Sequence, residues 1–141
     1  MIRKASAIWQ GGLKDGKGTI STESGVLSQT QYSFGTRFEN GKGTNPEELV
    51  AAAHAGCFSM ALSAELGKSG ITPASIETAA TVTLEKMDAG WTVSKVHLDV
   101  KAKIPGADPA TFNAAAETAK ANCPISKLLN ATITMQASLE K

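Results

Sequence analysis

The chain has 141 residues, in which 14 Lys and Arg nearly balance 13 Asp and Glu to a formal net charge of +1. This length is typical of one domain, and we expect a single domain over residues 1–141. The hydrophobic share of 42% and the charged share of 19% are typical of a folded protein and exclude a disordered chain. Near-neutral charge gives no basic patch for nucleic acid or for an anionic membrane, so we expect neither partner.

The number and setting of the cysteines indicate a compartment. Two cysteines are too few for a secreted disulfide scaffold. The N-terminal residues turn polar before a signal-like apolar run develops. The longest apolar stretch, residues 49–64, contains polar side chains and is shorter than the ~20 residues that a membrane span needs. We therefore expect a cytoplasmic protein whose cysteines carry thiol chemistry.

The first forty residues predict β structure. Residues 4–9 and 19–27 flank a glycine-rich turn in which Asp15-Gly16 suits the positive φ angles of a tight hairpin. A third strand is predicted at residues 31–38.

A long helix follows these strands. Asn45 is placed as its N-cap, Pro46 as its first helical residue, and Glu48 as the reciprocal partner of a capping box. We expect the helix to run to about Leu66 and to stop at Gly67 or Gly70. Its residues are apolar nearly all round, a pattern typical of a buried helix.

The next predicted unit is a hairpin. Residues 76–85 alternate between apolar and polar side chains, a turn spans residues 87–90, and a return strand runs from Trp91 to Ile104. The alternation changes phase at Ser94-Lys95, which predicts a β-bulge.

A second helix and a last strand complete the chain. Asp108-Pro109 opens an alanine-rich helix that extends to about Asn122, a short helical turn is predicted from Pro124, and residues 132–139 alternate as a strand. Strands in blocks, without regular βαβ alternation, favour an α+β fold over a doubly wound one.

The two cysteines allow two interpretations. A free cysteine often acts as a small buried hydrophobic residue. Against this, Cys123 directly precedes Pro124, where it is placed to cap a helical turn, and a helix N-terminus stabilises a thiolate. Cys57 lies in mid-helix among small neighbours that leave space over its sulfur for a substrate: Ala55, Gly56 and Ser59.

Four segments of the sequence form a distinctive pattern. They are Gly41-Lys42-Gly43-Thr44-Asn45-Pro46-Glu47-Glu48-Leu49, its continuation from Ala51 to Leu62 through His54-Ala55-Gly56-Cys57, the run from Gly18 to Leu27, and Cys123-Pro124-Ile125-Ser126. Together these segments closely resemble the OsmC family of thiol-dependent peroxidases. The resemblance covers nearly the whole chain. The related Ohr branch shares the Asn-Pro-Glu and two-cysteine pattern, but the N-terminal block is more similar to OsmC itself.

The resemblance implies a peroxidase that reduces organic hydroperoxides in oxidative and osmotic stress defence. It gives Cys57 the role of the peroxidatic cysteine and Cys123 that of the resolving cysteine. The catalytic arginine of the family corresponds to Arg37, and its glutamate to Glu47. The resemblance also implies an OsmC-like fold, in which antiparallel sheets wrap around a buried central helix in an intertwined homodimer. No metal, haem or flavin cofactor is implied, and the reductant is an external dithiol such as a dihydrolipoyl protein.

The chemistry explains these residue types. An ordinary thiol of pKa ~8.5 is only about 3% thiolate at pH 7, so the attacking cysteine needs activation. A partly desolvated Arg37 guanidinium would stabilise the thiolate and polarise the peroxide, and Glu47 would hold that guanidinium by a bidentate pair. Condensation of the Cys57 sulfenic acid with the Cys123 thiol would give a disulfide that prevents over-oxidation.

Helix geometry adds a hypothesis about assembly. Glu47 and Cys57 are ten residues apart, which is about 15 Å along one straight helix. Two copies of the helix crossing antiparallel near Ala52 would instead bring Cys57 of one subunit to Glu47 of the other. We therefore expect an obligate homodimer with two composite sites.

Other candidates have simpler explanations. Glu48 is explained as a helix-start carboxylate, and without the family resemblance Arg37 would be taken as a surface charge on a strand. His54 and His97 have no third ligand at metal spacing, so zinc is not expected. His54 lies one turn from Cys57, and we interpret it as a packed or interface histidine. The aromatic residues are core candidates, of which one or two would line an apolar substrate pocket: Trp9, Phe34, Phe38, Phe58 and Trp91.

Two rival functions remain at this point. A non-enzymatic stress protein would use the same pocket to bind small hydrophobic ligands, and it would lack thiol-dependent turnover. A structural dimer with inert buried cysteines would be alkylated slowly by iodoacetamide at pH 6.

Overall fold

Helix α2, Pro46–Gly67, contains the boundary between two units of the computed structural model, which describes residues 1–140. The first unit comprises residues 1–49 and the second unit begins at Val50. The mixture of strand blocks and helices agrees with the predicted α+β class.

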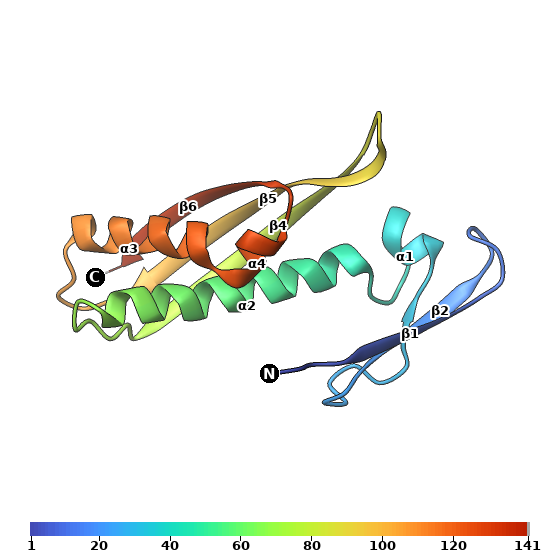
Figure 1. Cartoon of the computed structure of the whole chain (residues 1–141), viewed down its shortest axis with the longest axis horizontal. Helices are drawn as coiled ribbons and strands as arrows, with labels where there is room; N and C mark the ends of the chain where they lie inside the picture. The colour runs from blue at the N-terminus through green and yellow to red at the C-terminus, as the bar shows by residue number, and fades with distance from the viewer. Residues whose placement is uncertain (141) are drawn as a thin grey trace. The chain divides into compact units, whose positions relative to one another are not determined.

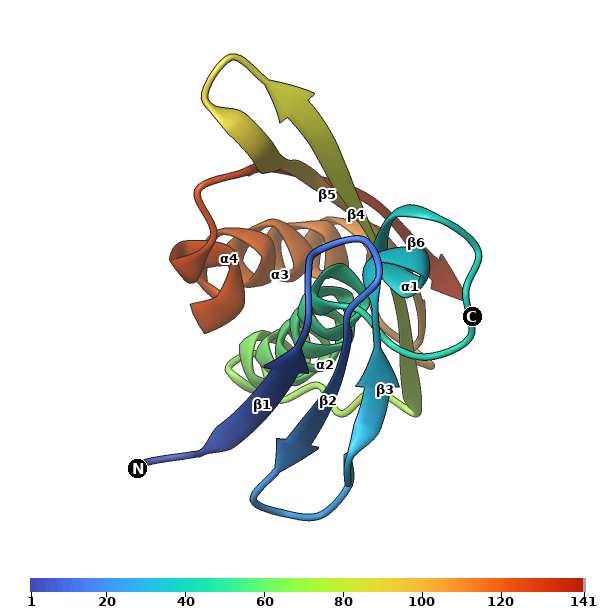
Figure 2. The same ribbon diagram turned by 90° about the vertical axis from the view of Figure 1, so that its right-hand side faces the viewer.

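The first unit is built on a small antiparallel sheet. Its strands β1, Ala5–Gln10, β2, Lys17–Thr22, and β3, Thr30–Tyr32, lie in the order β1-β2-β3 (Figure 2). The predicted hairpin of β1 and β2 is confirmed, with Ala5 opposite Thr22 and Gln10 opposite Lys17. A Cβ atom at Gly18 would lie 2.5 Å from the Tyr32 ring, so this buried position of β2 needs a glycine.

Two details of this unit differ from the prediction. The positive φ in the hairpin loop belongs to Gly11, at +92°, and not to Asp15-Gly16. Strand β2 ends at Thr22 and not at Leu27, because the Thr22 side chain accepts a hydrogen bond from Leu27 N–H at 3.1 Å and closes a turn there.

The prediction of a strand over residues 31–38 is wrong for its second half. Residues Phe34–Phe38 form the short helix α1, so Arg37 lies on a helix. The reason is local: Ser33 caps the helix by accepting from Thr36 N–H, and the Thr36 hydroxyl accepts from Ser33 N–H. This reciprocal capping box outweighs the strand preference of the aromatic residues.

The start of α2 follows the predicted pattern with one change. Asn45 Oδ1 accepts from Glu48 N–H at 2.8 Å, and Pro46 is the first helical residue. The Glu48 carboxylate accepts from the Thr44 hydroxyl at 3.3 Å, in place of the backbone bond of a capping box. The helix ends at Gly67, as predicted, and Gly70 adopts a φ of +69° beyond it.

The second unit places two helices on one face of a three-stranded sheet (Figure 1). Strands β4, Ser75–Met87, and β5, Gly90–Lys103, form the predicted antiparallel hairpin, and the register shift that leaves Ser94 unpaired confirms the bulge. Strand β6, Thr132–Glu140, lies parallel to β5, which departs from the expected antiparallel pairing.

The remaining helices follow the prediction. Helix α3, Pro109–Asn122, is capped by Asp108, whose carboxylate accepts from Thr111 N–H at 3.0 Å. Helix α4, Pro124–Leu128, begins directly after Cys123. Helices α2 and α3 pack with β5 around one core, formed mainly by Phe58, Leu62, Leu66, Val96, Leu98, Val100, Phe112 and Ala116.

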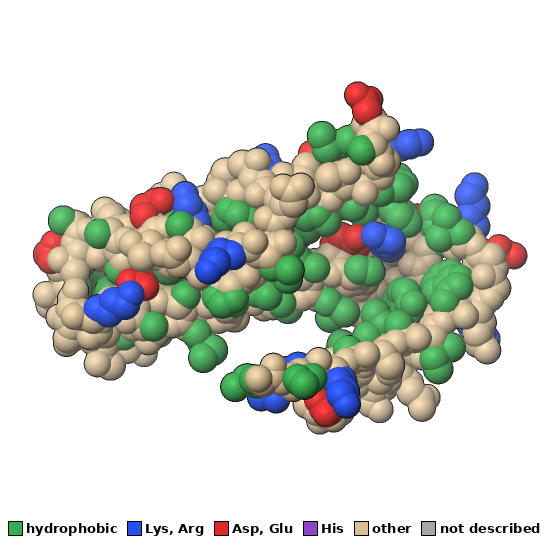
Figure 3. Space-filling model, in the orientation of Figure 1, with side chains coloured by type: hydrophobic (Ala, Val, Ile, Leu, Met, Phe, Trp, Pro, Cys, Tyr) green, Lys and Arg blue, Asp and Glu red, His purple; other side chains and the backbone are tan. Residues whose placement is uncertain are grey.

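Helix α2 is buried less completely than its composition predicts. Only a stripe of four of its residues is fully buried in this chain: His54, Phe58, Leu62 and Leu66. The residues beside this stripe leave an exposed apolar face, formed by Ala52, Ala53, Gly56, Met60 and Ala64. Met60 is 77% exposed, and hydrophobic side chains are visible on the surface in Figure 3.

The same helix is long and apolar enough to cross a membrane by length and composition, with a mean hydropathy of 1.4 over its most apolar window. Its buried stripe packs against β5 and α3 within the second unit. We therefore interpret α2 as a core helix of a folded domain.

Candidate active site

The second unit brings Cys57 and Cys123 together. Cys57 is half-buried in the middle of α2, and Cys123 is fully buried at the start of α4. Both thiols are free, and the Cys123 thiol donates a hydrogen bond to Cys57 Sγ at 2.8 Å. Because a disulfide needs an S–S separation of about 2.05 Å, the two sulfurs need to approach by less than 1 Å to be joined.

The surroundings of Cys57 raise the pKa of its thiol. Burial is the main cause and the adjacent Cys123 thiol adds to it, whereas a hydrogen bond from the Ile125 backbone N–H acts in the opposite direction. Among the described residues that shift this pKa there is no cation. The cysteine pair as it stands in this chain therefore lacks the group that would make Cys57 a thiolate at neutral pH.

A buried hydrogen bond lies one helical turn from each cysteine. His54 Nε2 and Ser126 Oγ are 2.7 Å apart, and they join α2 to α4. His54 is fully buried, as the interpretation of a packed histidine predicts, and burial lowers the pKa of its imidazole.

The first unit brings Arg37 and Glu47 together. Arg37 Nη2 donates to Glu47 Oε1 at 2.7 Å, and Arg37 Nε donates to Oε1 and Oε2 at 3.1 and 3.2 Å. This fork geometry fixes the guanidinium plane. Asn45 Nδ2 also donates to the Thr36 carbonyl at 3.0 Å and ties α1 to the start of α2. The Arg37 and Glu47 side chains joined in this way are called the Arg37–Glu47 pair below.

An apolar cavity of about 260 Å³ opens beside this guanidinium. Aromatic side chains dominate its wall, and the Arg37 guanidinium also stacks 5.2 Å from the centre of the Phe38 ring. Of the five aromatic core candidates, Trp9, Phe34 and Phe38 line this cavity, Phe58 lies in the core of the second unit, and Trp91 is 57% exposed. The lining residues are Trp9, Leu13, Tyr32, Ser33, Phe34, Arg37, Phe38 and Pro46.

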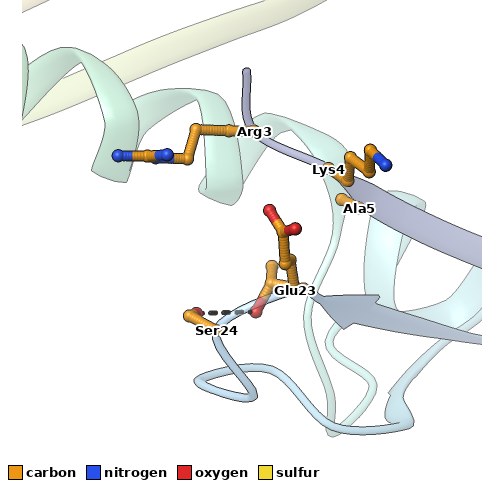
Figure 4. Close-up of a pocket in the computed structure, with 6 residues that line it drawn as sticks. Arg3, Lys4, Ala5, Glu23 and Ser24 are labelled. Atoms are coloured by element: carbon orange, nitrogen blue, oxygen red, sulfur yellow. Dashed lines mark hydrogen bonds between the residues drawn. The ribbon is translucent and has the colours of Figure 1, made fainter. Parts of the chain in front are cut away.

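A larger hollow of about 520 Å³ lies at the other end of the same unit (Figure 4). It is an open depression between the N-terminal segment and the turn after β2, and its lining residues include Arg3, Lys4, Glu23 and Ser24. It contains no cysteine and no histidine, so the thiol chemistry has no place there.

The four predicted site residues therefore form two pairs, Arg37 with Glu47 in the first unit and Cys57 with Cys123 in the second. Within each pair the side chains are hydrogen-bonded to each other. Glu47 and Cys57 are ten residues apart on α2, which is about 15 Å along the helix.

Two groups near the cysteines were not predicted from the sequence. They are the Ser126 hydroxyl and the Ile125 backbone N–H. The signal for Ser126 is its spacing: it follows Cys123 by three residues, as His54 precedes Cys57 by three. Because the resemblance already implied that the two cysteines meet, polar residues one helical turn from each were candidates for a contact of their own.

The comparisons with known proteins decide the family. Residues 39–138 match the family model described as OsmC-like protein. The chain belongs to the OsmC family. It is 54% identical over 138 residues to Peroxiredoxin OsmC of Escherichia coli K12, covering 98% of this chain and 96% of that protein. It is 33% identical over 100 residues to organic hydroperoxide resistance protein-like 2 of Staphylococcus epidermidis, covering 70% of this chain and 68% of the relative.

Solved structures of the OsmC family share this fold. The organic hydroperoxide resistance protein OhrB of Bacillus subtilis aligns with a TM-score of 0.70 at 25% identity, over 96% of this chain and 98% of its own. An OsmC-like protein of Mycoplasma pneumoniae aligns with a TM-score of 0.78 at 14% identity, over 100% and 99% of the two chains. With its free cysteine pair and its peroxiredoxin relatives, this OsmC-family chain is a cysteine-based peroxidase.

Proposed function

We propose that this chain reduces organic hydroperoxides to alcohols, with Cys57 as the peroxidatic and Cys123 as the resolving cysteine. The observation that carries the proposal is the 2.8 Å separation of two free thiols from distant parts of the chain. Two relatives are named for resistance to organic hydroperoxides, which supports this substrate class.

The proposed reaction has two steps. The Cys57 thiolate attacks the terminal oxygen of the hydroperoxide, the O–O bond breaks, and the departing alkoxide takes up a proton to leave as the alcohol. Cys57 is thereby oxidised to a sulfenic acid. The Cys123 thiol then attacks the sulfenic sulfur, so that an S–S bond forms and water leaves. An external dithiol, such as that of a dihydrolipoyl protein, is oxidised in turn and restores both thiols.

The proposed activation of Cys57 uses the Arg37–Glu47 pair of a second subunit. The groups around Cys57 in its own chain raise the pKa of the thiol, so an additional cation is needed to form the thiolate. The Arg37 guanidinium is held by the Glu47 carboxylate in the geometry that such a role requires. Two copies of α2 crossing antiparallel near Ala52 would bring Cys57 of one copy to this pair in the other.

The exposed apolar face of α2 supports that assembly. Ala52 and Ala53 lie at the proposed crossing point, are exposed in the single chain and are small enough for close approach of two helices. An open strip of small side chains on a helix would remain in contact with water unless a partner covers it. The proposed enzyme is therefore an obligate homodimer with two composite sites.

The aromatic cavity is the proposed place for the organic part of the substrate. Its volume of about 260 Å³ and its aromatic wall suit an alkyl or aryl group, and Arg37 lines it. A hydroperoxide bound there would direct its polar oxygen atoms toward the guanidinium. The substrate preference would then be set by residues of the first unit.

The proposed enzyme is one functional domain over residues 1–141. The identity to Peroxiredoxin OsmC spans both units, which supports this assignment. A cytoplasmic location agrees with two cysteines that must return to the free state after each turnover.

The first test is the consumption of cumene hydroperoxide by the purified protein with excess dithiol. The parent chain is expected to turn over rapidly and Cys57→Ser to be inactive. In a parallel reaction without dithiol, Cys123→Ser is expected to complete its first step and then to accumulate oxidised Cys57. No turnover by the parent with several dithiols would refute the proposal and favour a ligand-binding protein. Equal turnover by the parent and Cys57→Ser would refute the assignment of the nucleophile.

A further inference from the structure

The contact between His54 and Ser126 has no place in the reaction described so far. It is buried, and it joins two segments that are 72 residues apart in the sequence. The two segments are those that carry the cysteines. His54 precedes Cys57 by three residues on α2, and Ser126 follows Cys123 by three residues on α4, so the contact lies about 4.5 Å along each helix from the corresponding cysteine.

Helix α4 is short, and few polar contacts orient it against α2. It has only five residues, and Ser126 is the one residue within it that is buried. Ile125 and Leu129 pack partly buried against the core, whereas Leu128 is 74% exposed. The directional contacts of this segment with α2 are the His54–Ser126 hydrogen bond and the contacts of Cys57 with the Ile125 N–H and the Cys123 thiol. Only the His54–Ser126 bond involves no reacting sulfur, so it can hold α4 and the adjacent Cys123 against α2 while the sulfurs react.

Burying a histidine at this position costs free energy that an apolar residue of similar size would not. Its Nδ1 is buried and has no hydrogen-bond partner among the described residues. An unpaired lone pair is less costly than an unpaired N–H, so the proton lies on Nε2, which donates to Ser126 Oγ. A leucine would pack at this position without leaving a buried polar atom unpaired, which indicates that the directional bond itself is needed.

We propose that His54 and Ser126 are a positioning pair that holds Cys123 within reach of the oxidised Cys57 and so accelerates the resolving step. The pair touches neither the peroxide nor a reacting sulfur, and it acts by fixing the backbone that carries each cysteine. The sulfurs lie 2.8 Å apart in the reduced chain, and a disulfide requires a further approach of less than 1 Å. A rigid contact beside them is therefore compatible with both redox states.

The kinetic part of this inference rests on the proposed function. The Cys57 sulfenic acid meets one of two fates: it condenses with the Cys123 thiol and releases water, or a second hydroperoxide oxidises it to the sulfinic acid. Loosening α4 should slow the first reaction and leave the second unchanged. The positioning pair would then determine how many turnovers the enzyme completes at high peroxide concentration before Cys57 is oxidised to the sulfinic acid.

The test compares His54→Leu and Ser126→Ala with a matched control on the sheet. His97 Nδ1 makes a similar bond, of 2.6 Å, to Thr134 Oγ1 between β5 and β6, so His97→Leu removes a histidine–hydroxyl contact of the same unit away from α4. His54→Gln, which retains a side-chain N–H donor, should restore most of the lost function.

The first measurement needs no peroxide and is therefore independent of the proposed function. The disulfide of each variant is equilibrated with glutathione, which reports how strongly the protein holds the two thiols together. We expect the equilibrium constant to fall by about tenfold in His54→Leu and Ser126→Ala, because about one buried hydrogen bond is lost, and not in His97→Leu.

The second measurement is a single turnover with cumene hydroperoxide, followed by trapping of the sulfenic acid and by intact mass. Sulfenic acid should form at the parental rate, whereas its conversion to disulfide should slow by about tenfold and sulfinic acid should accumulate. Slower formation of sulfenic acid would instead indicate a role in thiol activation and would overturn the proposal.

The remaining outcomes are also decisive. An unchanged glutathione equilibrium in a folded Ser126→Ala, or an equal loss in His97→Leu, would overturn the positioning role. If His54→Leu does not fold, Ser126→Ala decides, because it removes one atom. If Ser126→Ala does not fold either, the contact is structural and the proposal fails. A parent without peroxidase activity would refute the proposed function, while the glutathione equilibrium would still test the pair.

Discussion

The two units differ in how they are stabilised and in what they carry. The second unit has a continuous core of α2, α3 and β5, and it holds both cysteines. In the first unit every residue of β1 is exposed, and buried positions are limited to a few small residues such as Gly18 and Thr36. This thinly packed unit carries the guanidinium and the aromatic cavity. The redox centre thus lies on the unit with a continuous hydrophobic core, and the groups proposed to activate it and to select the substrate lie on the unit with few buried residues.

The largest expected effect on activity comes from replacing Cys57, the proposed nucleophile of the second unit. Cys57→Ser should lower the turnover of cumene hydroperoxide by at least about 1,000-fold, because a hydroxyl does not replace a thiolate as the nucleophile. The unfolding midpoint should change little, since Cys57 is only half-buried. Residual activity near the parental level would show that Cys57 is not the nucleophile.

Changes to the Arg37–Glu47 pair should affect activity without affecting the cysteine scaffold. Arg37→Met and Glu47→Gln should each lower kcat/KM by about 100-fold, because the oriented cation that stabilises the thiolate is lost or released. The glutathione equilibrium of the Cys57–Cys123 disulfide should stay at its parental value in both variants. If alkylation of Cys57 at pH 6 is as fast in Arg37→Met as in the parent, the guanidinium does not activate the thiol.

Leucine-to-alanine substitutions in the two units should have different consequences, loss of stability in the second unit and weaker substrate binding in the first. Leu62→Ala leaves a cavity in the second-unit core and should lower the free energy of unfolding by about 3 kcal/mol. Leu13→Ala in the first unit, where the side chain is 67% exposed, should cost less than about 0.5 kcal/mol and instead raise KM for a bulky hydroperoxide about threefold. Equal destabilisation by the two variants in denaturant titrations would contradict the difference in packing.

The smallest effect concerns the buried imidazole. Because burial lowers the pKa of His54 below its ordinary value of 6.5, the unfolded chain takes up a proton that the folded chain does not accept. The free energy of unfolding should therefore fall as the pH drops below 6.5 and level off below the pKa of the folded state. His54→Gln should remove this part of the pH dependence in denaturant titrations between pH 8 and 5. If the free energy of unfolding depends on pH equally in the parent and in His54→Gln, His54 does not contribute to that dependence.

The difference between the units also explains which predictions succeeded. Local signals set the ends of α2, the bulge opposite Thr83 and the Asp108 cap of α3, and each was predicted from the sequence. Helix α1 was missed because the Ser33–Thr36 capping box occupies only four residues within a strand-like pattern.

Long-range contacts could not be read from the residues alone. The parallel pairing of β6 with β5 and the bond between His54 and Ser126 join segments far apart in the sequence. The pairing of Arg37 with Glu47 and of Cys57 with Cys123 was expected only because the chain resembles a family. Composition indicates that α2 is buried but not what buries it. Part of the helix is exposed in the single chain, and the expected crossing with a second copy near Ala52 would cover that part.

The division of the site between two subunits is tested most directly by mixing two inactive variants. Cys57→Ser retains the Arg37–Glu47 pair, and Arg37→Met retains the cysteines, so a hybrid dimer would contain one complete composite site. Equimolar co-refolding should recover about a quarter of the parental activity, since half of the dimers would be hybrids with one of two sites complete. A mixture that forms hybrids by native mass spectrometry and stays inactive would contradict the account.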